Sequence, residues 1–402
     1  MRVLILAIYF PKPHNPVMGV WALEQAKALQ KKGVEVVVIS PTPWVPKAVG
    51  ITSKLKNWAS VPNEYNWDGI KTYYPRCLSY PVGIVKKLYL RVPQIQYYPV
   101  WRSVQKLISA KGMNFDLIYC HHPLIEGTVG LAIKERYGIP LVVIQHSLTN
   151  IQYALDYNIR KKAYIRVLNK ADAVVTVSKL LASHMRPFLT DSSKVISIVR
   201  NGVDISKLPV RKMNKPNIYQ GKKVILSVGW LEERKGHSIL IQAIKKVSFL
   251  IPNVKCIIIG RGSQKDQLRK LINQLHLERH VEIIDNISHG ELMSFMSWCD
   301  VFALPSWNEP FGVVYIEAMG CKTPIIGTKG EGIAEVVKNR KHGLLVQPGD
   351  VNELAQSLLI LLQDNKLAGR IGRAGYHLVL DSLSWESNVS KMISIFRKLV
   401  LK

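Results

Sequence analysis

The sequence predicts an α/β protein built from two doubly wound domains. Short runs of consecutive apolar residues alternate with helical patterns along the whole chain, as is typical of parallel strands that are buried on both faces. The runs form two series, and a polar stretch that contains proline, residues 208–221, separates them. With 402 residues, the chain is long enough for two domains of ordinary size. Two series of βα units therefore predict two domains that face each other across a cleft.

The first domain is expected to span residues 1–207. Its strands are predicted at 3–9, 34–40, 117–120, 140–145, 173–178 and 195–199. The first helix is predicted at 20–32, with Gly33 ending it. The apolar start of the chain resembles a signal peptide, but two prolines follow it and no small-residue cleavage site is present. A buried first strand is therefore the better interpretation.

The second domain is expected to span residues 222–385. Its strands are predicted at 224–229, 255–260, 281–285, 300–304, 324–327 and 343–346. The central feature of the chain is 302–320, in which a strand, a tight loop and a helix follow one another. This arrangement aims the free N–H groups at the start of the helix toward an anion.

Two glutamates border this loop. Glu309 precedes a proline and is therefore expected to be extended or in a turn. Gly312 allows a close approach of the backbone, and the helix is predicted to begin at Val313. Glu317 falls in the second turn of that helix, so both carboxylates can border one pocket. Because carboxylates repel phosphate, each is expected to face neutral hydroxyl groups, as on a sugar or a ribose.

The residues around these glutamates, Leu-Pro-Ser, Glu-Pro-Phe-Gly and Glu-Ala-Met, resemble the Glu-x7-Glu motif of retaining glycosyltransferases of family 4. The resemblance extends over almost the whole chain and implies the GT-B fold, in which two Rossmann-like domains face each other. It implies that Glu309 contacts the donor sugar and that Glu317 holds the nucleotide ribose. It also places Phe311, Gly312 and Val313 at the donor site.

A glycine-bounded loop, 229–236, follows the first strand of the second domain and resembles the phosphate-binding loop of the family. The resemblance implies that Lys235 meets the donor diphosphate, where a lysine offsets the charge that builds on the leaving group. Trp230 stands where the family usually has an arginine. Arg234, a candidate for binding the donor, or Arg261 could take over that contact.

Three further stretches are interpreted through the same resemblance. Residues 329–332 and Glu335 resemble the loop that closes the donor pocket. The last amphipathic helix, 386–402, is expected to cross back onto the first domain. Gly19, between the first strand and the first helix, is a candidate for touching the donor phosphate, and a glycine that merely begins a helix is the alternative.

His146 follows a predicted strand of the first domain, at the end where open α/β sheets bind ligands. In the resembled family a histidine at this position lies beside the donor sugar. Glu309, Lys235 and His146 are therefore the candidate catalytic residues. His121 and His122 end the neighbouring strand, and either a packing or a binding role is open for them. No carboxylate stands at ligand spacing from them, so no metal is expected.

Composition limits the partners without choosing among them. The net charge is +27, which is compatible with nucleic acid, an anionic membrane surface or anionic substrates. No apolar run approaches the ~18 residues that a membrane-spanning helix needs. Five scattered cysteines form no C-x-x-C pair, which indicates reduced thiols and a cytoplasmic protein.

These observations together predict a retaining glycosyltransferase that uses a UDP- or GDP-sugar and no metal or other cofactor. By the resemblance, the nucleoside diphosphate leaves and the acceptor hydroxyl attacks on the same sugar face, so no side-chain nucleophile is required. The acceptor is expected to be a glycan or a lipid-linked molecule in cell-envelope polysaccharide or glycolipid synthesis. A nucleotide-sugar epimerase of the same architecture and a basic nucleic-acid-binding protein are the alternatives.

By the resemblance, the second domain holds the nucleotide sugar and the first domain holds the acceptor. The first domain carries a basic, aromatic segment, 69–115, that contains no Asp or Glu. Its basic residues are Lys71, Arg76, Lys86, Lys87, Arg91, Arg102, Lys106 and Lys111, and its aromatic residues include Tyr73, Tyr74, Tyr80, Tyr89, Tyr97, Tyr98 and Trp101. Such residues suit the headgroup layer of an anionic membrane. We expect peripheral attachment to the inner face of the cell membrane and no nucleic-acid partner. The alternative is a solvated insertion whose tyrosines pack on the domain.

Overall fold

The computed structural model describes residues 1–45, 53–78, 93–209 and 213–401. The chain divides into two compact units. The first unit contains Met1–Arg200 together with Asn388–Lys402, and the second contains Asn201–Ser387. Each unit is an α/β domain with its own largely parallel sheet, which confirms the predicted fold class.

The described strands of the first unit form a sheet with the order β10-β9-β8-β7-β1-β2-β5-β4. These strands are β1 (Arg2–Leu6), β2 (Glu35–Ile39), β4 (Glu64–Trp67), β5 (Ile70–Tyr73), β7 (Leu117–Cys120), β8 (Leu141–Gln145), β9 (Ala173–Thr176) and β10 (Ile196–Ile198). Neighbouring strands are parallel except β4 and β5. Two short strands, β3 (Thr42–Pro43) and β6 (Arg76–Cys77), pair separately.

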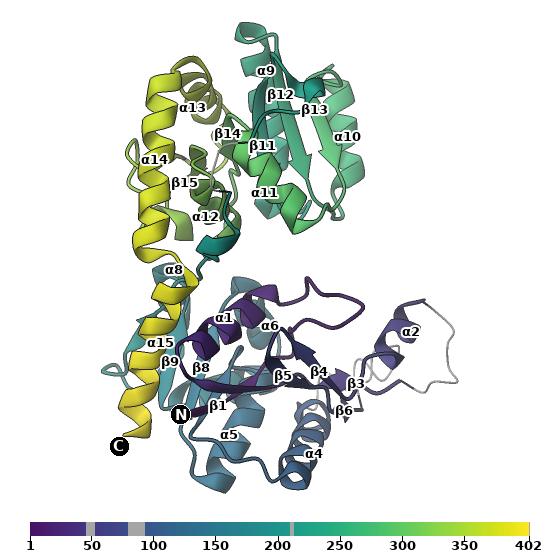
Figure 1. Ribbon diagram of the computed structural model, residues 1–402, viewed down its shortest axis with the longest axis vertical. Helices are drawn as coiled ribbons and strands as arrows, with labels where there is room; N and C mark the ends of the chain where they lie inside the picture. Colours follow the sequence, from purple (N-terminus) through teal and green to yellow (C-terminus); the bar gives the residue numbers. More distant parts are fainter. Residues whose placement is uncertain (46–52, 79–92, 210–212, 402) are drawn as a thin grey trace. The chain divides into compact units, whose positions relative to one another are not determined.

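Helices cover both faces of this sheet, with α1 on one side and α4 and α5 on the other (Figure 1). The helices of this unit are α1 (Val20–Lys31), α2 (Ser53–Ala59), α4 (Pro93–Lys111), α5 (Ile125–Tyr137), α6 (Leu148–Leu155), α7 (Asn158–Lys170) and α8 (Lys179–Met185). The last helix, α15 (Trp385–Val400), joins the unit from Asn388 onward. Gln25 of α1 donates a 2.6 Å hydrogen bond to Asn388, and the ring of Tyr119 lies 5.4 Å from that of Phe396.

The second unit has a six-stranded parallel sheet with the order β13-β12-β11-β14-β15-β16. Its strands are β11 (Lys223–Val228), β12 (Val254–Ile259), β13 (Val281–Ile284), β14 (Val301–Ala303), β15 (Ile325–Thr328) and β16 (Leu344–Val346). Its helices are α9 (His237–Leu250), α10 (Lys265–Gln274), α11 (His289–Trp298), α12 (Val313–Gly320), α13 (Val351–Gln363) and α14 (Asn365–Ser382). The strands are almost wholly buried, as their unbroken apolar runs require.

Each sheet has one point at which the order of its strands reverses. In the first unit this point lies between β1 and β7, and in the second between β11 and β14. The loops that follow the two adjacent strands run to opposite faces of the sheet and leave a crevice at the carboxyl ends. Ligands of open α/β sheets bind in that crevice, so these two points are where binding sites are expected.

The short strands between residues 42 and 77, β3 to β6, are absent from the sequence prediction. β4 and β5 form an antiparallel hairpin whose turn residues, Asp68 and Gly69, both have positive φ angles of 49° and 94°. Asp-Gly is the sequence signal for such a turn. The parallel βα pattern on either side favoured a fully parallel sheet, which was wrong for this edge.

Other boundaries differ by a few residues. The first strand ends at Leu6 rather than residue 9, because the backbone turns at once and Phe10 N–H bonds to the Ile8 carbonyl. Part of the predicted 208–221 linker, residues 210–212, lies outside the described residues. All five cysteines are buried, and none of them forms a disulfide. No described helix is both long and apolar enough to span a membrane.

Candidate active site

The reversal point of the second sheet brings together two loops that are distant in sequence. Lys235, at the end of a short 3-10 turn (Glu233–Lys235) after β11, donates a hydrogen bond from Nζ to the carboxylate of Glu309, in the loop after β14. Arg234 Nη1 lies 3.6 Å from the same carboxylate oxygen. Lys235 and Glu309 are each only 8% exposed. The structure therefore groups three of the predicted site residues into one ion cluster, in which Lys235 and Glu309 are buried and Arg234 is partly exposed.

Backbone contacts hold the two loops in this position. Gly236 has a φ of 69°, and a Cβ placed there would lie 2.1 Å from the carbonyl oxygen of Pro305. Trp307 N–H donates to the Arg234 carbonyl over 2.8 Å. Only glycine allows so close an approach at a positive φ. The fixed backbone sets where the Lys235 side chain can point.

A third loop, after β15, holds Glu309 from the other side. Glu309 N–H donates to the Glu331 carboxylate over 2.7 Å, and the Glu309 carbonyl accepts from Gly332 N–H over 3.1 Å. A Cβ on Gly332 would lie 1.8 Å from the Pro310 carbonyl oxygen. Burial raises the pKa of Glu331. Glu331 lies in the stretch 329–332, which the sequence resemblance assigns to the loop that closes the donor pocket, although it was not among the candidate site residues.

The helix that follows Glu309 begins as predicted at Val313. Gly312 adopts a φ of 76° at its start, where a Cβ would lie 2.6 Å from the Tyr315 ring. Glu317, in the second turn, is 2.9 Å from His289 Nε2 of α11. Phe311 is 2% exposed and packs in the core, which leaves its backbone as the part that a donor could reach.

The loop that resembles a phosphate-binding loop has an exposed tryptophan at its start. Trp230 is 60% exposed. Arg234 bonds to Glu232 over 3.0 Å while remaining beside Glu309. The carbonyl of Arg261 accepts a hydrogen bond from Leu231 N–H over 2.8 Å. The loop 229–236 therefore lies beside the loop after β12, in which Arg261 stands between two glycines.

The predicted site residues of the first unit lie in its histidine-rich region. Both ring nitrogens of His146 are buried and have no hydrogen-bond partner. Its ring lies 4.2 Å from that of Trp21 and is stacked at 5.4 Å on His121. Burial lowers the pKa of His146, so the ring is neutral at pH 7. A Cβ on Gly19 would lie 2.1 Å from the Tyr9 carbonyl oxygen, so the packing of the backbone alone requires a glycine at this position.

The basic, aromatic segment is only in part a surface. Tyr73, Tyr74 and Tyr97 are buried at 7% exposure or less, so the expectation of a tyrosine-lined surface was wrong for them. The Arg76 guanidinium donates to backbone carbonyls, including that of Trp58 over 2.8 Å. Tyr98 is 58% exposed. Five residues of this prediction lie outside the described residues: Tyr80, Lys86, Lys87, Tyr89 and Arg91.

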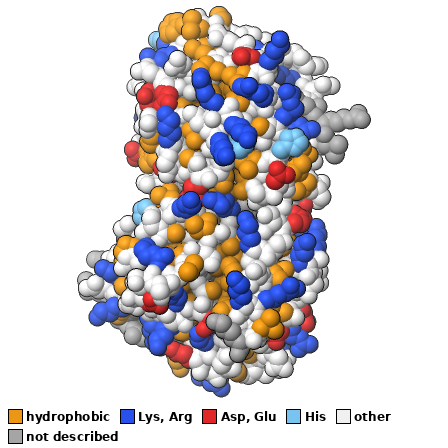
Figure 2. All heavy atoms as spheres, turned by 90° about the vertical axis from the view of Figure 1, so that its left-hand side faces the viewer, with side chains coloured by type: hydrophobic (Ala, Val, Ile, Leu, Met, Phe, Trp, Pro, Cys, Tyr) orange, Lys and Arg blue, Asp and Glu red, His pale blue; other side chains and the backbone are white. Residues whose placement is uncertain are grey.

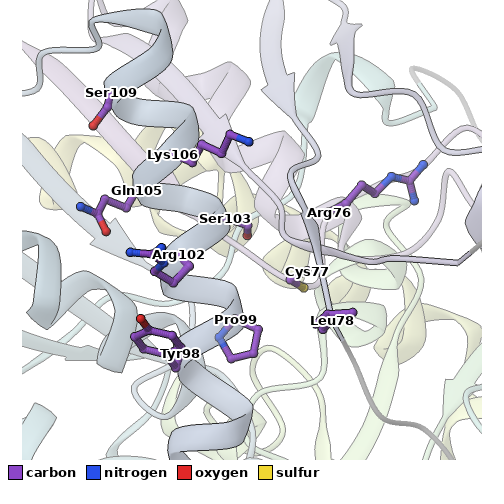
Figure 3. A pocket seen from close by; sticks show the side chains of 10 residues that line it. All are labelled: Arg76, Cys77, Leu78, Tyr98, Pro99, Arg102, Ser103, Gln105, Lys106 and Ser109. Carbon is purple, nitrogen blue, oxygen red and sulfur yellow. The ribbon is translucent and has the colours of Figure 1, made fainter.

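The exposed part of the segment borders a hollow of about 570 Å³ between α4 and β6 (Figure 3). Arg102 and Lys106 of α4 line it opposite Arg76 and Leu78. The guanidinium of Arg102 lies 5.8 Å from the Tyr98 ring. Within the described ranges, no three His, Cys, Asp or Glu side chains are grouped so that they could hold a metal ion.

Two family models match the chain. Residues 211–378 match "Glycosyl transferases group 1" and residues 18–207 match "Glycosyltransferase Family 4". An uncharacterized glycosyltransferase of Methanocaldococcus jannaschii is 27% identical over 90% of this chain and 98% of its own length. A Bacillus subtilis glycosyltransferase named for teichuronic acid biosynthesis is 25% identical over 89% of this chain and 88% of its own.

A solved structure has the same fold over nearly the whole chain. The Anabaena protein HepE, in complex with UDP-glucose, has a TM-score of 0.72 at 20% identity and covers 99% of this chain and 100% of its own. The two matched regions correspond to the two α/β units, and the chain belongs to the two-domain glycosyltransferases of family 4 and group 1.

Proposed function

We propose that the protein transfers a sugar from a nucleotide-sugar donor, UDP- or GDP-linked, to a glycan or lipid-linked acceptor hydroxyl, with retention of anomeric configuration. The observation that carries this proposal is the Lys235–Glu309 pair with Arg234 at the reversal point of the second sheet. Two cations at a helix-bearing crevice suit a diphosphate. One carboxylate between them suits the hydroxyls of the adjoining sugar.

The donor diphosphate would exchange with Glu309 as the partner of Lys235. Lys235 would then stabilise the negative charge that develops on the leaving diphosphate. Glu309, released from the lysine, would accept hydrogen bonds from sugar hydroxyls. Glu317, which is 2.9 Å from His289 in this structure, would bind the ribose diol.

Retention follows if the acceptor hydroxyl attacks the face that the diphosphate leaves. The diphosphate itself would then take the proton of the acceptor, so no side-chain nucleophile is needed. Positioning of the two reactants accounts for much of the rate in such a reaction. His146, neutral and with unpaired ring nitrogens, is the proposed contact to the donor sugar from the first unit, and Gly19 is the proposed phosphate contact.

Known relatives support the donor and the role in the cell. The Anabaena structure of the same fold contains UDP-glucose, and the Bacillus relative is named for synthesis of an envelope polymer. These relatives support the proposal of a role in cell-envelope polysaccharide or glycolipid synthesis. A cytoplasmic location, on the inner face of the membrane, fits the exposed Arg102 and Lys106.

On one face of the molecule (Figure 2), the distribution of charge gives no support to a nucleic-acid-binding function. On the face shown in Figure 2, Lys and Arg side chains are interspersed with apolar and acidic ones. Binding of a nucleic-acid backbone favours a continuous basic stripe. This face has no such stripe.

A thermal-shift screen of UDP-, GDP- and ADP-sugars tests the donor, because a ligand that binds the folded state raises Tm. We expect one nucleotide class to stabilise the protein. NMR of the product formed with that donor should show the donor's anomeric configuration. Stabilisation by none of the three classes would contradict the proposed donor, and an inverted product would contradict the proposed retention.

A further inference from the structure

Glu317, the proposed ribose contact, has a partner on a neighbouring helix. His289 is the first residue of α11, and its Nε2 lies 2.9 Å from Oε1 of Glu317 in α12. Because a carboxylate can only accept hydrogen bonds, Nε2 carries the proton and donates it. The Glu317 side chain is 14% exposed and that of His289 is 56% exposed. Among the side chains that the structure describes, His289 is the only one that bonds to this carboxylate.

Contacts at both ends of α11 fix the position from which His289 reaches Glu317. At its start, Ser288 Oγ accepts from Glu291 N–H over 3.2 Å, and Ser288 N–H donates to the Glu291 carboxylate over 2.8 Å. Such a reciprocal cap sets the direction of the first turn of a helix. Near its end, the Thr323 hydroxyl donates to the Met296 carbonyl over 2.5 Å and fastens the segment after α12 to α11. The imidazole is therefore held beside the second turn of α12 by the packing of the two helices.

The bond from His289 uses only part of the capacity of the Glu317 carboxylate. An ionised carboxylate has about four lone-pair sites on its two oxygens. Nε2 occupies one site on Oε1, and Oε2 bonds to no side chain within the described ranges. Two neighbouring hydroxyl groups can therefore bond to the carboxylate while the imidazole stays in place. A side chain that is already held in its binding orientation loses less entropy when a ligand binds, and affinity rises accordingly.

We propose that His289 is a positioning residue for the nucleotide: it holds the Glu317 carboxylate in the orientation that accepts the two ribose hydroxyls. This inference rests on the proposed function, in which Glu317 binds the ribose, and adds the group that acts through Glu317. In the opposite role, His289 would occupy the place of the ribose and would have to leave. The two roles differ in sign, because removal of a positioning residue weakens binding and removal of a competitor tightens it.

The test is calorimetry on the full chain with the nucleoside diphosphate that stabilises it and with the 2′,3′-dideoxy form of that nucleotide, which lacks both hydroxyls. His289→Phe keeps a flat ring and removes the donor, whereas His289→Gln keeps an N–H donor. His377→Phe, at an exposed position of α14 in the same unit, is the matched control. His289→Phe is also combined with Glu317→Gln, since a residue that acts through another has no further effect once that other is changed.

We expect the nucleoside diphosphate to bind His289→Phe about threefold to tenfold more weakly than wild type, and His289→Gln and His377→Phe about as tightly as wild type. The dideoxy nucleotide should bind wild type and all three single variants equally. In the Glu317→Gln background, His289→Phe should cause no further loss. Tighter binding by His289→Phe would show that His289 competes with the ribose, and an equal loss for both nucleotides would show a merely structural role. Either result would overturn the inference.

The same measurements separate a failure of this inference from a failure of the proposed function. If wild type prefers the nucleotide with both hydroxyls and His289→Phe binds it unchanged, the ribose role of Glu317 stands and only the role of His289 is removed. If wild type binds the two nucleotides equally, the ribose role of Glu317 is wrong, and the inference is overturned with it.

Discussion

Lys235 is the residue on which the proposed chemistry depends most. It is almost fully buried, and its charge is balanced by Glu309 within hydrogen-bond distance. Lys235→Ala should lower turnover by about 10²–10³, because the leaving diphosphate loses its closest cation. Circular dichroism should show an intact fold. Full activity of this variant together with an inactive Arg234→Ala would transfer the role to Arg234.

Glu317 should contribute to affinity rather than to the chemical step. Glu317→Gln keeps the size of the side chain and removes its charge. We expect a loss of about 1.5–3 kcal/mol in nucleoside diphosphate binding, measured by calorimetry, because hydrogen bonds to a charged acceptor are the stronger kind. Glu278→Gln, at an exposed position of the same unit, is the control. Equal affinities of the two variants would remove Glu317 from the ribose site.

Glu126 should make stability depend on pH. Burial raises its pKa from 4.5 to about 7, and the groups near its carboxyl include Tyr9 and Cys120, together with the Ile8 N–H that donates to it. Between these pH values the folded state holds a proton that the unfolded chain has lost. The stability that the protonated carboxyl contributes to the folded state is therefore fully present below pH 4.5 and is lost as the pH rises through about 7.

Glu126→Gln stays neutral at every pH and should remove that loss. Its free energy of unfolding should fall less between pH 6 and pH 8.5 than that of wild type, by about 1.5 kcal/mol. Urea unfolding at the two pH values measures this difference. Glu135→Gln, exposed on the same helix, should behave as wild type. An identical pH dependence in wild type and Glu126→Gln would show that this carboxyl is ionised in the folded state.

At the scale of elements, the close packing of the two loops in the second unit can be tested through glycine. Gly236→Ala places a Cβ against the Pro305 carbonyl, whereas Gly221→Ala has a similar φ of 71° and nothing within 4 Å. In the Gly221 variant, the free energy of unfolding should fall only by the cost of placing a side chain in a left-handed conformation, about 1–2 kcal/mol. In the Gly236 variant, the free energy of unfolding measured with urea should fall by clearly more, and nucleoside diphosphate should bind more weakly. Equal losses would mean that the loops are not held by this contact.

The elements themselves were largely predictable from sequence. Buried parallel strands are continuous apolar runs, and those of both units lie within a few residues of their predicted positions. The β4–β5 hairpin was missed because its Asp68-Gly69 turn stood within a pattern that otherwise predicted parallel strands. Residues 300–304 were predicted as a strand and Val313 as the start of a helix, because a proline and a glycine mark the loop between them, and the structure has them at 301–303 and 313–320.

The contacts within the site were less predictable. Glu309 and Lys235 are 74 residues apart, and only the strand order that sets β14 beside β11 makes them partners. The contact of Glu331 with Glu309 N–H was not predicted for the same reason, since it depends on the position of β15. The composition of the basic, aromatic segment does not say which of its tyrosines pack in the core. The burial of Tyr73, Tyr74 and Tyr97 could therefore not be predicted from it.

At the scale of the whole molecule, the net charge of +27 should affect where the protein is found. We expect it to sediment with anionic but not with neutral liposomes at low salt and to be released at high salt. Arg102→Glu with Lys106→Glu should weaken sedimentation and leave donor binding unchanged. Lys161→Glu with Lys162→Glu, exposed on α7, gives the same change in charge elsewhere. Equal weakening by both pairs would mean that net charge, rather than this segment, is responsible.

The most direct test of the central claim is a calorimetric titration of the stabilising nucleoside diphosphate into wild type, Lys235→Ala and Glu309→Gln. If the diphosphate replaces Glu309 as the partner of Lys235, removal of the competing charge should tighten binding. We predict binding roughly fivefold to tenfold tighter for Glu309→Gln and at least about tenfold weaker for Lys235→Ala. Glu309→Gln should nevertheless lose turnover. Weaker binding by Glu309→Gln, or unchanged binding by Lys235→Ala, would contradict the exchange and with it the proposed donor site.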